Sequence, residues 1–166
     1  ILGKGSRSAP EYIKAKTAAT FEDYRRTLNE SLQEGNYDWG IFTAAVADFQ
    51  PESVFEGKLP SNQKQLSLKL VPTVKVIEEV RQHFPELKMV TFKYEENISH
   101  EELMEIAKNR LSEKDGSQLV VANRVEEFKQ DGTQVAWLLE SKQEPQKHIG
   151  KKDIANAILD RIELTA

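Results

Sequence analysis

The chain has 166 residues, of which 39% are hydrophobic and 30% are charged, and its formal net charge is −4. This length and composition indicate one soluble globular domain in a cytoplasmic setting, and the acidic excess argues against a nucleic-acid binder without excluding a small anionic ligand. No apolar run approaches the roughly 18 residues of a membrane span, and the absence of cysteine excludes disulfides, cysteine–zinc sites and thiol catalysis.

The first part of the chain alternates between strand-like and helix-like stretches. EYIKAK, residues 11–16, has the period-2 pattern of a half-buried strand. An amphipathic helix is predicted for residues 20–35, with Thr20 as its N-cap. WGIFTAAVA, residues 39–47, is a continuous apolar run typical of a strand covered on both faces. Residues 49–64 contain two prolines and a glycine and predict a long loop, which is typical of a functional lid or of disorder.

The alternation continues to the end of the chain. Strands are predicted at residues 65–71, 87–92 and 117–123, and helices at residues 73–84, 99–114 and 151–164. Ser99 and Glu102 form a capping box at the start of the second of these helices. Residues 125–140 predict a hairpin that turns at Asp131-Gly132. Strands separated by such helices indicate an α/β fold: a Rossmann-like three-layer sandwich with a mainly parallel sheet and a C-terminal hairpin.

The start of the chain resembles the end of a buried strand. The sequence opens on Ile1 and Leu2 and passes at once into the loop-like GKGSRSAP. GKGSRS has the first two glycines of a dinucleotide-binding fingerprint without the third, so a plain turn is the better interpretation. We expect residues 1–166 to form a single α/β domain that lacks its N-terminal segment and is the C-terminal portion of a longer protein.

Three side chains lie at the carboxyl ends of predicted strands, where ligands bind in open parallel sheets: Asp48, Phe92 and Asn123. Alanines precede Asp48, and their short side chains would let a flat ligand approach the main chain. The Asp48 carboxylate could accept hydrogen bonds from an amine or a hydroxyl, or hold a cation. An equally good interpretation is that Asp48 caps a turn before Pro51.

Several cations follow in the same region. Lys58, beside a glycine in the long loop, could close over a phosphate. Arg110 and Lys114 stand at i and i+4, and so share one helix face. On local evidence alone, a solvated surface role is favoured for all three cations. The three histidines are scattered without metal-ligand spacing, so no metal site in the protein is predicted.

The motifs AAVADFQP, LKLVP, VTF and VVAN, with Lys58 between the first two, occur in the order seen in phosphopantothenate–cysteine ligases. The chain resembles this family from about residue 11 to residue 163, and AAVAD followed by an aromatic residue is the most specific match. The resemblance implies a coenzyme A biosynthesis enzyme that activates 4′-phosphopantothenate with CTP, or with ATP as in some relatives. It also implies Mg²⁺ with the triphosphate, cysteine as the second substrate, and a homodimer.

The resemblance assigns expected roles to individual positions. The nucleotide-binding positions that it implies are Phe42, Thr43, Ala44, Asp48, Lys58, Phe92, Arg110 and Lys114. Lys58 corresponds to the lysine of a flexible flap and would be catalytic. Asn123 would contact the acid substrate.

The chain departs from the family pattern at several motifs. KLPS stands in place of a lysine-rich KIKK, and residues 73–75 are TVK in place of NPD. TFKYEE replaces GFAAET, ANR replaces AND, and the SNHSSG segment with the catalytic asparagine is absent. One alternative is therefore a catalytically inactive nucleotide-binding or assembly module on the same fold. An unrelated nucleotide-binding oxidoreductase is a weaker alternative, because the glycine fingerprint is incomplete.

Overall fold

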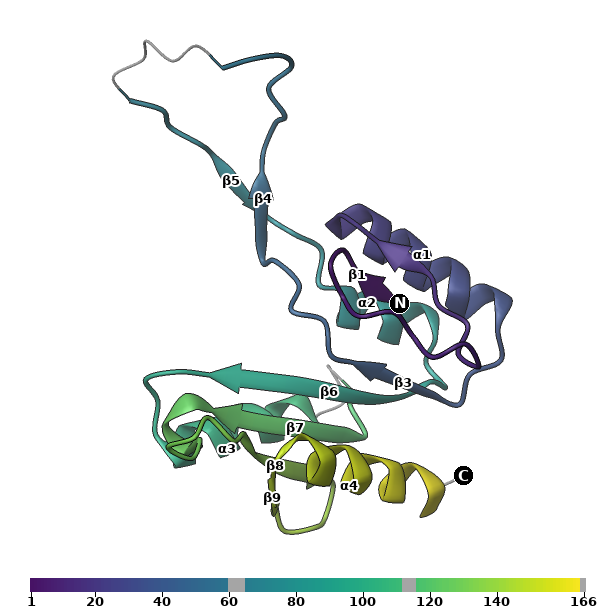
Figure 1. Ribbon diagram of the computed structural model, residues 1–166, viewed down its shortest axis with the longest axis vertical. Coiled ribbons are helices and arrows are strands. Elements are labelled where there is room, and N and C mark those ends of the chain that lie inside the picture. The colour runs from purple at the N-terminus through teal and green to yellow at the C-terminus, as the bar shows by residue number, and fades with distance from the viewer. Residues whose placement is uncertain (60–64, 112–115, 165–166) are drawn as a thin grey trace.

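The computed structural model describes residues 1–59, 65–111 and 116–164 (Figure 1). Its centre is a five-stranded sheet in the order β3-β6-β7-β8-β9. The strands of this sheet are β3 (Trp39–Phe42), β6 (Lys88–Glu95), β7 (Leu119–Arg124), β8 (Val135–Glu140) and β9 (Gln146–Ile149). β3, β6 and β7 run parallel, and β8 and β9 continue the sheet as an antiparallel hairpin. The predicted α/β fold with a mainly parallel sheet is confirmed, and its C-terminal hairpin, β8-β9, lies later in the chain than the predicted one.

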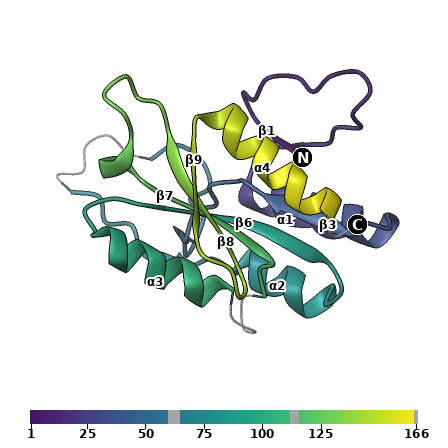
Figure 2. The same cartoon turned by 90° about the horizontal axis from the view of Figure 1, so that it is seen from below.

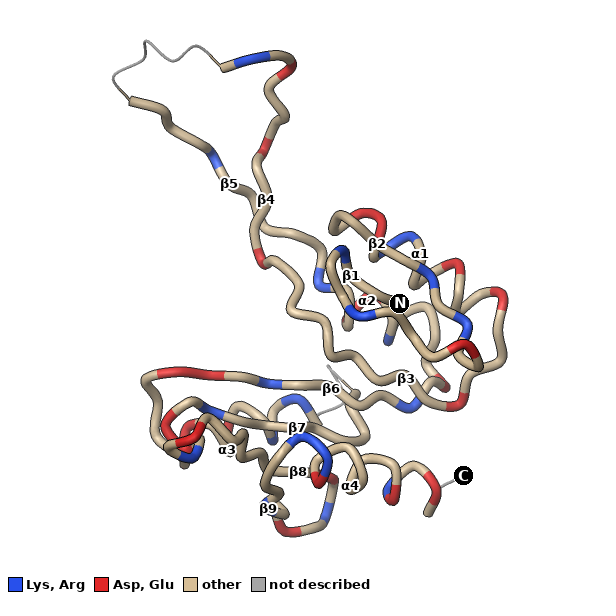
Figure 3. Tube along the Cα trace, in the orientation of Figure 1, with Lys and Arg blue, Asp and Glu red and all other residues tan. Residues whose placement is uncertain are grey.

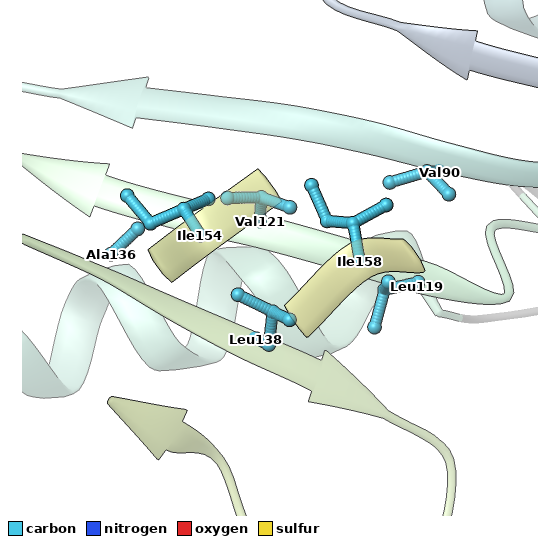
Figure 4. Close-up of a cluster of buried hydrophobic side chains, with 7 residues drawn as sticks. All are labelled: Val90, Leu119, Val121, Ala136, Leu138, Ile154 and Ile158. Atoms are coloured by element: carbon cyan, nitrogen blue, oxygen red, sulfur yellow. The ribbon is translucent and has the colours of Figure 1, made fainter. Parts of the chain in front are cut away.

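Helices cover both faces of this sheet (Figure 2). They are α1 (Phe21–Glu34), α2 (Val76–His83), α3 (His100–Arg110) and α4 (Lys151–Leu164). Alternate side chains of β6 point to opposite faces: Met89 packs with Leu28 of α1 and Val80 of α2, whereas Val90 joins the cluster around Ile158 of α4 (Figure 4). None of the described helices is long and apolar enough to cross a membrane.

Capping residues set where two of the predicted helices begin. Thr20 accepts a hydrogen bond from the Asp23 main-chain N–H at 3.1 Å, and the Asp23 carboxylate accepts one from the Thr20 N–H at 3.2 Å. Ser99 and Glu102 make the same reciprocal pair at the start of α3. α2 differs, because its N-cap is Lys75 and no side chain caps it. It begins at Val76, three residues later than predicted.

The predicted strand at residues 11–16 is wrong. These residues form turns and irregular structure, and the Tyr12 side chain is 87% exposed. The nearest strand is β2 (Thr17–Ala18), which pairs in parallel with β1 (Leu2–Gly3). An alternating pattern makes a strand only where one face is buried, and the two apolar residues of EYIKAK are both exposed.

The predicted strand at residues 39–47 is shorter than expected. β3 ends at Phe42, and residues 43–48 have no regular structure. Its pairing with β6 stops at Phe42 and Thr91, after which β6 continues beside β7 alone. Ile41 is 47% exposed, so the described chain covers only one face of β3 fully. Asp48 therefore lies six residues beyond the end of the strand rather than at its exit.

The segment that follows Asp48 projects from the body of the molecule as an arm, of which the structure describes residues 49–59 and 65–72 (Figure 1). Its base is an antiparallel ribbon of β4 (Phe49–Pro51) and β5 (Leu70–Pro72). The predicted loop thus begins with a short strand. The predicted strand at residues 65–71 is largely wrong, because residues 65–69 have no regular structure. Among the described residues of the arm, strand pairing is found at the base, where Pro51 and Leu70 form the last pair of the ladder.

The predicted hairpin over residues 125–140 is also wrong in its first arm. Residues Val125–Glu127 form a 3-10 turn, η1, and β8 pairs instead with β7 and β9. The turn at Asp131-Gly132 is present, with Gly132 at a φ of 80° and its N–H bonded to the Lys129 carbonyl at 2.8 Å. The glutamate side chains of η1 accept hydrogen bonds from His100 of α3 and from the Asn97 N–H before it.

Candidate functional site

A cleft of about 250 Å³ opens beyond the end of β3. It is called here the β3 cleft, and five parts of the chain line it: Tyr24 of α1, residues 42–48, residues 73–78 at the start of α2, the middle of β6 and the end of α3. Its lining includes Phe42, Ala44, Val46, Ala47, Asp48, Thr73, Lys75, Thr91, Phe92 and Arg110. The small residues after β3 leave the main chain accessible, as the alanine-rich sequence predicts.

Hydrogen bonds fix the position of Asp48 between the arm and α2. The Thr73 N–H donates to the Asp48 carbonyl at 2.9 Å, and the Thr73 hydroxyl donates to the Ala47 carbonyl at 2.6 Å. Lys75 Nζ donates to Asp48 Oδ1 at 2.5 Å. Within the part of the chain that the structure describes, this is the bond that the Asp48 side chain makes, so the turn-cap interpretation of Asp48 does not match the structure.

The carboxylate of Asp48 is surrounded by positive charge. The Lys75 ammonium holds the pKa of Asp48 below its usual value, chiefly through their hydrogen bond, and Lys93 and Arg110 add attraction from further away. Lys93 itself pairs with Glu95 at 2.5 Å. Asp48 and Lys75 remain 68% and 57% exposed, so both can reach a ligand in the β3 cleft.

The uncapped start of α2 faces the same cleft. Val76, Ile77 and Glu78 all line it, and their main-chain N–H groups precede the first i→i−4 partner of the helix. The positive end of the helix dipole adds to Lys75 and Arg110 and favours an anion at this place. A lysine at an N-cap has the wrong charge for the dipole, and Asp48 opposite it offsets that repulsion. The cleft therefore suits a ligand with an anionic part.

Five of the predicted nucleotide-binding residues come together in the β3 cleft: Phe42, Ala44, Asp48, Phe92 and Arg110. Lys58 does not join them, because it lies exposed on the arm and is not among the residues that line the cleft. Lys114, the remaining predicted cation, lies outside the described residues.

Thr43 and Asn123 lie on the other face of the sheet, in a groove of about 540 Å³ beside α4. This α4 groove is largely apolar, and its lining includes Ile41, Thr43, Phe92, Val121, Asn123, Ala136, Lys151, Ile154 and Ile158. Phe92 of β6 lines both cavities. In the described ranges, no group of three or more acidic or histidine side chains is placed to hold a metal ion.

Lys75, which pairs with Asp48 in the β3 cleft, is a site residue that the sequence pattern alone does not identify. In the sequence, the triplet TVK stands out only as a departure from the family pattern. A signal was present, because a residue directly before a helix that lacks a Ser, Thr, Asp or Asn cap is a position where a ligand can replace the cap. Asp48 is 27 residues away in the sequence, so the pairing itself was not visible.

A hydrogen-bonded network around Glu127 explains another departure, the arginine of ANR. Glu127 accepts hydrogen bonds from Trp137 Nε1 at 2.6 Å, His100 Nδ1 at 2.8 Å and Arg124 Nε at 2.9 Å. Arg124 Nη1 also donates to the Ile98 carbonyl at 2.5 Å. Burial alone would raise the pKa of Glu127, but these three hydrogen bonds outweigh it and lower that pKa. Arg124 thus ties the end of β7, beside Asn123, to the start of α3.

Basic and acidic positions are interspersed along the chain (Figure 3). The positive charge around Asp48 is accordingly a local feature. The fold brings together Lys75 at the start of α2, Lys93 of β6 and Arg110 of α3. A local cluster of this size suits a small anionic ligand.

Comparison with known proteins shows where this fold and site belong. The family model of the DNA/pantothenate metabolism flavoprotein C-terminal domain matches residues 1–165. The chain is 31% identical over 157 residues to a coenzyme A biosynthesis bifunctional protein, CoaBC, from Thermococcus kodakarensis, covering 94% of this chain and 38% of that protein. It is 33% identical over 156 residues to the protein of the same name from Methanocaldococcus jannaschii, covering 93% and 37%. The chain thus spans less than two fifths of these relatives.

Solved structures show the same fold. The DNA/pantothenate metabolism flavoprotein from Streptococcus pneumoniae superposes with a TM-score of 0.83 at 21% identity, covering 99% of this chain and 79% of that one. The C-terminal domain of a coenzyme A biosynthesis bifunctional protein CoaBC superposes with a TM-score of 0.74 at 21% identity, covering 98% and 71%. Since the family model spans nearly all residues, the chain belongs to the DNA/pantothenate metabolism flavoprotein C-terminal domain family.

Proposed function

We propose that the chain is the nucleotide-binding part of a ligase of coenzyme A biosynthesis, which joins 4′-phosphopantothenate to cysteine through an acyl-nucleotide made from CTP. The observation that carries this proposal is the β3 cleft, where a carboxylate, two cations and an uncapped helix start lie side by side. A role in coenzyme A biosynthesis is supported by the family to which the chain belongs and by the names of its relatives.

The two ends of the cleft suit the two ends of a nucleoside triphosphate. Its phosphates would accept hydrogen bonds from the first-turn N–H groups of α2 and charge from Arg110 and Lys75. Its base amine or ribose hydroxyls would donate to Asp48, and its flat base would lie against the small residues after β3. Mg²⁺ would be held mainly by the phosphates, because it keeps waters and takes few protein ligands. Asp48 and Glu78 are the carboxylates that line the cleft.

In the proposed reaction a carboxylate oxygen of 4′-phosphopantothenate attacks the α-phosphorus of CTP. The bond from that phosphorus to the bridging oxygen breaks, and pyrophosphate leaves. The amine of cysteine then attacks the acyl carbon, loses a proton, and displaces CMP to form the amide. Cations placed where phosphate charge develops would speed the first step, which is the role proposed for Arg110 and for Lys58 once the arm closes.

The acid substrate would approach from the α4 groove. Its apolar floor suits the aliphatic part of the pantothenate chain, and Thr43 and Asn123 offer a hydroxyl and an amide for its polar groups. The shared residue Phe92 places this groove next to the β3 cleft, so a carboxylate at the end of β3 could reach a nucleotide phosphate.

Calorimetric titration tests the proposal. CTP with Mg²⁺ should bind the chain, ATP with Mg²⁺ should bind more weakly or equally, and NAD should not bind. Release of pyrophosphate on addition of 4′-phosphopantothenate would separate an active ligase from an inactive nucleotide-binding module. Binding of NAD in preference to both triphosphates would overturn the proposal in favour of an oxidoreductase.

The arm should respond to nucleotide. The β3 cleft, at about 250 Å³, is below the roughly 300–1,000 Å³ of most small-molecule pockets, so another element must help to cover a triphosphate. We expect hydrogen exchange of residues 49–59 and 65–72 to slow when CTP and Mg²⁺ are added. Exchange that stays unchanged at saturating CTP would rule out a covering role for the arm.

We also propose that the chain forms a homodimer through the arm. Its described residues expose seven large apolar side chains: Phe49, Val54, Phe55, Leu59, Leu66, Leu68 and Leu70. Apolar surface of this extent on an open ribbon favours pairing with a second copy. Sedimentation at micromolar concentration should give a dimer, and Leu68→Glu should give a monomer. Leu164→Glu, at an equally exposed leucine on α4, is the control and should remain a dimer. A wild-type chain that sediments only as a monomer would contradict this assembly.

A further inference from the structure

Lys75 combines two features: it is the N-cap residue of α2, and its side chain pairs with Asp48. As the N-cap of α2 it stands beside the uncapped first-turn N–H groups, where an anion would bind. Its ammonium nevertheless points to the Asp48 carboxylate, at 2.5 Å. The part of the β3 cleft suited to phosphate and the part suited to a nucleoside are therefore linked by one flexible side chain.

This ion pair occupies the acceptor that a nucleoside would need. A base amine or ribose hydroxyl that donates to Asp48 must take the place of the Lys75 ammonium. A nucleoside without phosphate offers Lys75 no new anion, so Lys75 would be left beside the positive end of the α2 dipole. A triphosphate brings its own negative charge to the start of α2, and Lys75 can turn to it without moving its main chain.

The other charges around the Lys75–Asp48 pair also single out Lys75. Lys93 is held by Glu95 at 2.5 Å, and Arg110 lies on α3, across the cleft from α2. Glu78, in the first turn of α2, is the other carboxylate that lines the cleft. Among the described charges near Asp48, Lys75 is thus the one that both contacts this carboxylate and occupies the N-cap position of α2.

We propose that Lys75 is a specificity-determining residue that changes partner, from Asp48 in the free protein to a ligand phosphate in the complex. The exchange frees Asp48 for the nucleoside only when the ligand carries phosphates, so that the cleft discriminates nucleoside triphosphates from nucleosides. The inference rests on the proposed nucleotide site, which it deepens, and it assigns a role to a residue that departs from the family pattern.

The test is a set of NMR titrations with three ligands, namely CTP, cytidine and inorganic tripolyphosphate, on the wild-type chain and on Lys75→Met. Methionine keeps the length of the side chain and removes its charge. CTP and tripolyphosphate should bind the variant about fivefold more weakly, because a charge-assisted contact is lost. Cytidine should bind Lys75→Met about two- to fivefold more tightly, because the Lys75 ammonium no longer competes with cytidine for the Asp48 carboxylate. The gain is small because the Lys75–Asp48 ion pair is exposed.

Lys16→Met is the matched control. Lys16 makes a similarly exposed ion pair with Glu34 at 2.9 Å and is not part of the β3 cleft, so all three affinities should be unchanged. Melting temperatures of both variants should equal that of the wild-type chain, because both lysines are exposed.

Opposite shifts for cytidine and CTP are the result that supports partner exchange. The inference is overturned if Lys75→Met also weakens the binding of cytidine, or if it leaves the affinity for CTP unchanged. It is likewise overturned if the wild-type chain binds CTP while neither the wild-type chain nor Lys75→Met binds cytidine at millimolar concentration. In these cases the nucleotide site itself stands. A wild-type chain that fails to bind CTP at all would instead overturn the proposed function together with this inference.

Discussion

Asp48→Asn should weaken CTP binding about tenfold or more and leave the melting temperature unchanged. Asparagine keeps the size of the side chain and one acceptor oxygen, so the variant differs in charge. Hydrogen bonds to an ionised acceptor are about twice as strong as those to a neutral one, which gives this magnitude. Release of Lys75 offsets little of the loss, because its pair with Asp48 is exposed and screened by water. Calorimetry and a thermal melt measure the two quantities.

Glu34→Gln provides the control for Asp48→Asn. Glu34 pairs with Lys16 at 2.9 Å on α1, its side chain is 70% exposed against 68% for Asp48, and it is not among the residues that line the β3 cleft. It should bind CTP as the wild-type chain does. If Asp48→Asn binds every triphosphate as tightly as the wild-type chain and melts much earlier, Asp48 has a structural role and the assignment of the cleft is wrong.

The helices were predictable because their signals are local. A capping box occupies four consecutive residues, and the periodic apolar face of α1 repeats within one element, so Thr20 and Ser99 mark real helix starts. The order of strands and helices then restricts the fold to a few α/β arrangements, which is why the sheet and its two helical layers followed.

The strands were less predictable because their extent depends on partners distant in sequence. β3 stops at Phe42 because β6 pairs with it only that far, although the apolar run continues to Ala47. Residues 65–71 alternate as a strand does, yet only Leu70 and Val71 of them find a partner, in β4. Alternating apolar and polar residues indicate a segment that is suited to strand pairing. Whether the segment pairs depends on the rest of the chain.

The site was predictable in part, for the same reason. Asp48 and Phe92 follow from their places at the ends of predicted strands, and Arg110 from its place on a predicted helix face, with the family resemblance adding a role in nucleotide binding. The β3 cleft brings these three residues together. Lys75 was missed because its partner is on another element. In the sequence, Arg124 stands where the family pattern has an aspartate, so that the position reads only as the loss of an acid. In the structure, Arg124 donates hydrogen bonds to Glu127 and to the Ile98 carbonyl.

Glu127→Gln should lower the free energy of unfolding by about 2 kcal/mol, because it leaves a largely buried set of donors short of an acceptor. The Glu127 side chain is 12% exposed and accepts from Trp137, His100 and Arg124. Glutamine retains one acceptor oxygen and turns an N–H₂ group toward donors. In a chain of this size the change corresponds to a fall in melting temperature of about 4–8 °C.

Glu126→Gln is the neighbouring control, because Glu126 is exposed and accepts one hydrogen bond, from the Asn97 N–H at 2.5 Å, which glutamine can also accept. Its free energy of unfolding should change by less than about 0.5 kcal/mol. Urea unfolding followed by tryptophan fluorescence compares both variants with the wild-type chain.

The stability difference between Glu127→Gln and the wild-type chain should depend on pH in a defined direction. The folded protein lowers the pKa of Glu127 from its ordinary value of 4.5, so the unfolded state binds the proton more readily. The stabilisation is therefore fully present above pH 4.5 and is lost as the pH falls through the lowered pKa of the folded state. The wild-type chain and Glu127→Gln should converge in stability over that acidic range. A difference that stays constant as the pH falls from 4.5 until the wild-type chain unfolds would show that packing at this position, rather than the charge of Glu127, holds the end of β7 against α3.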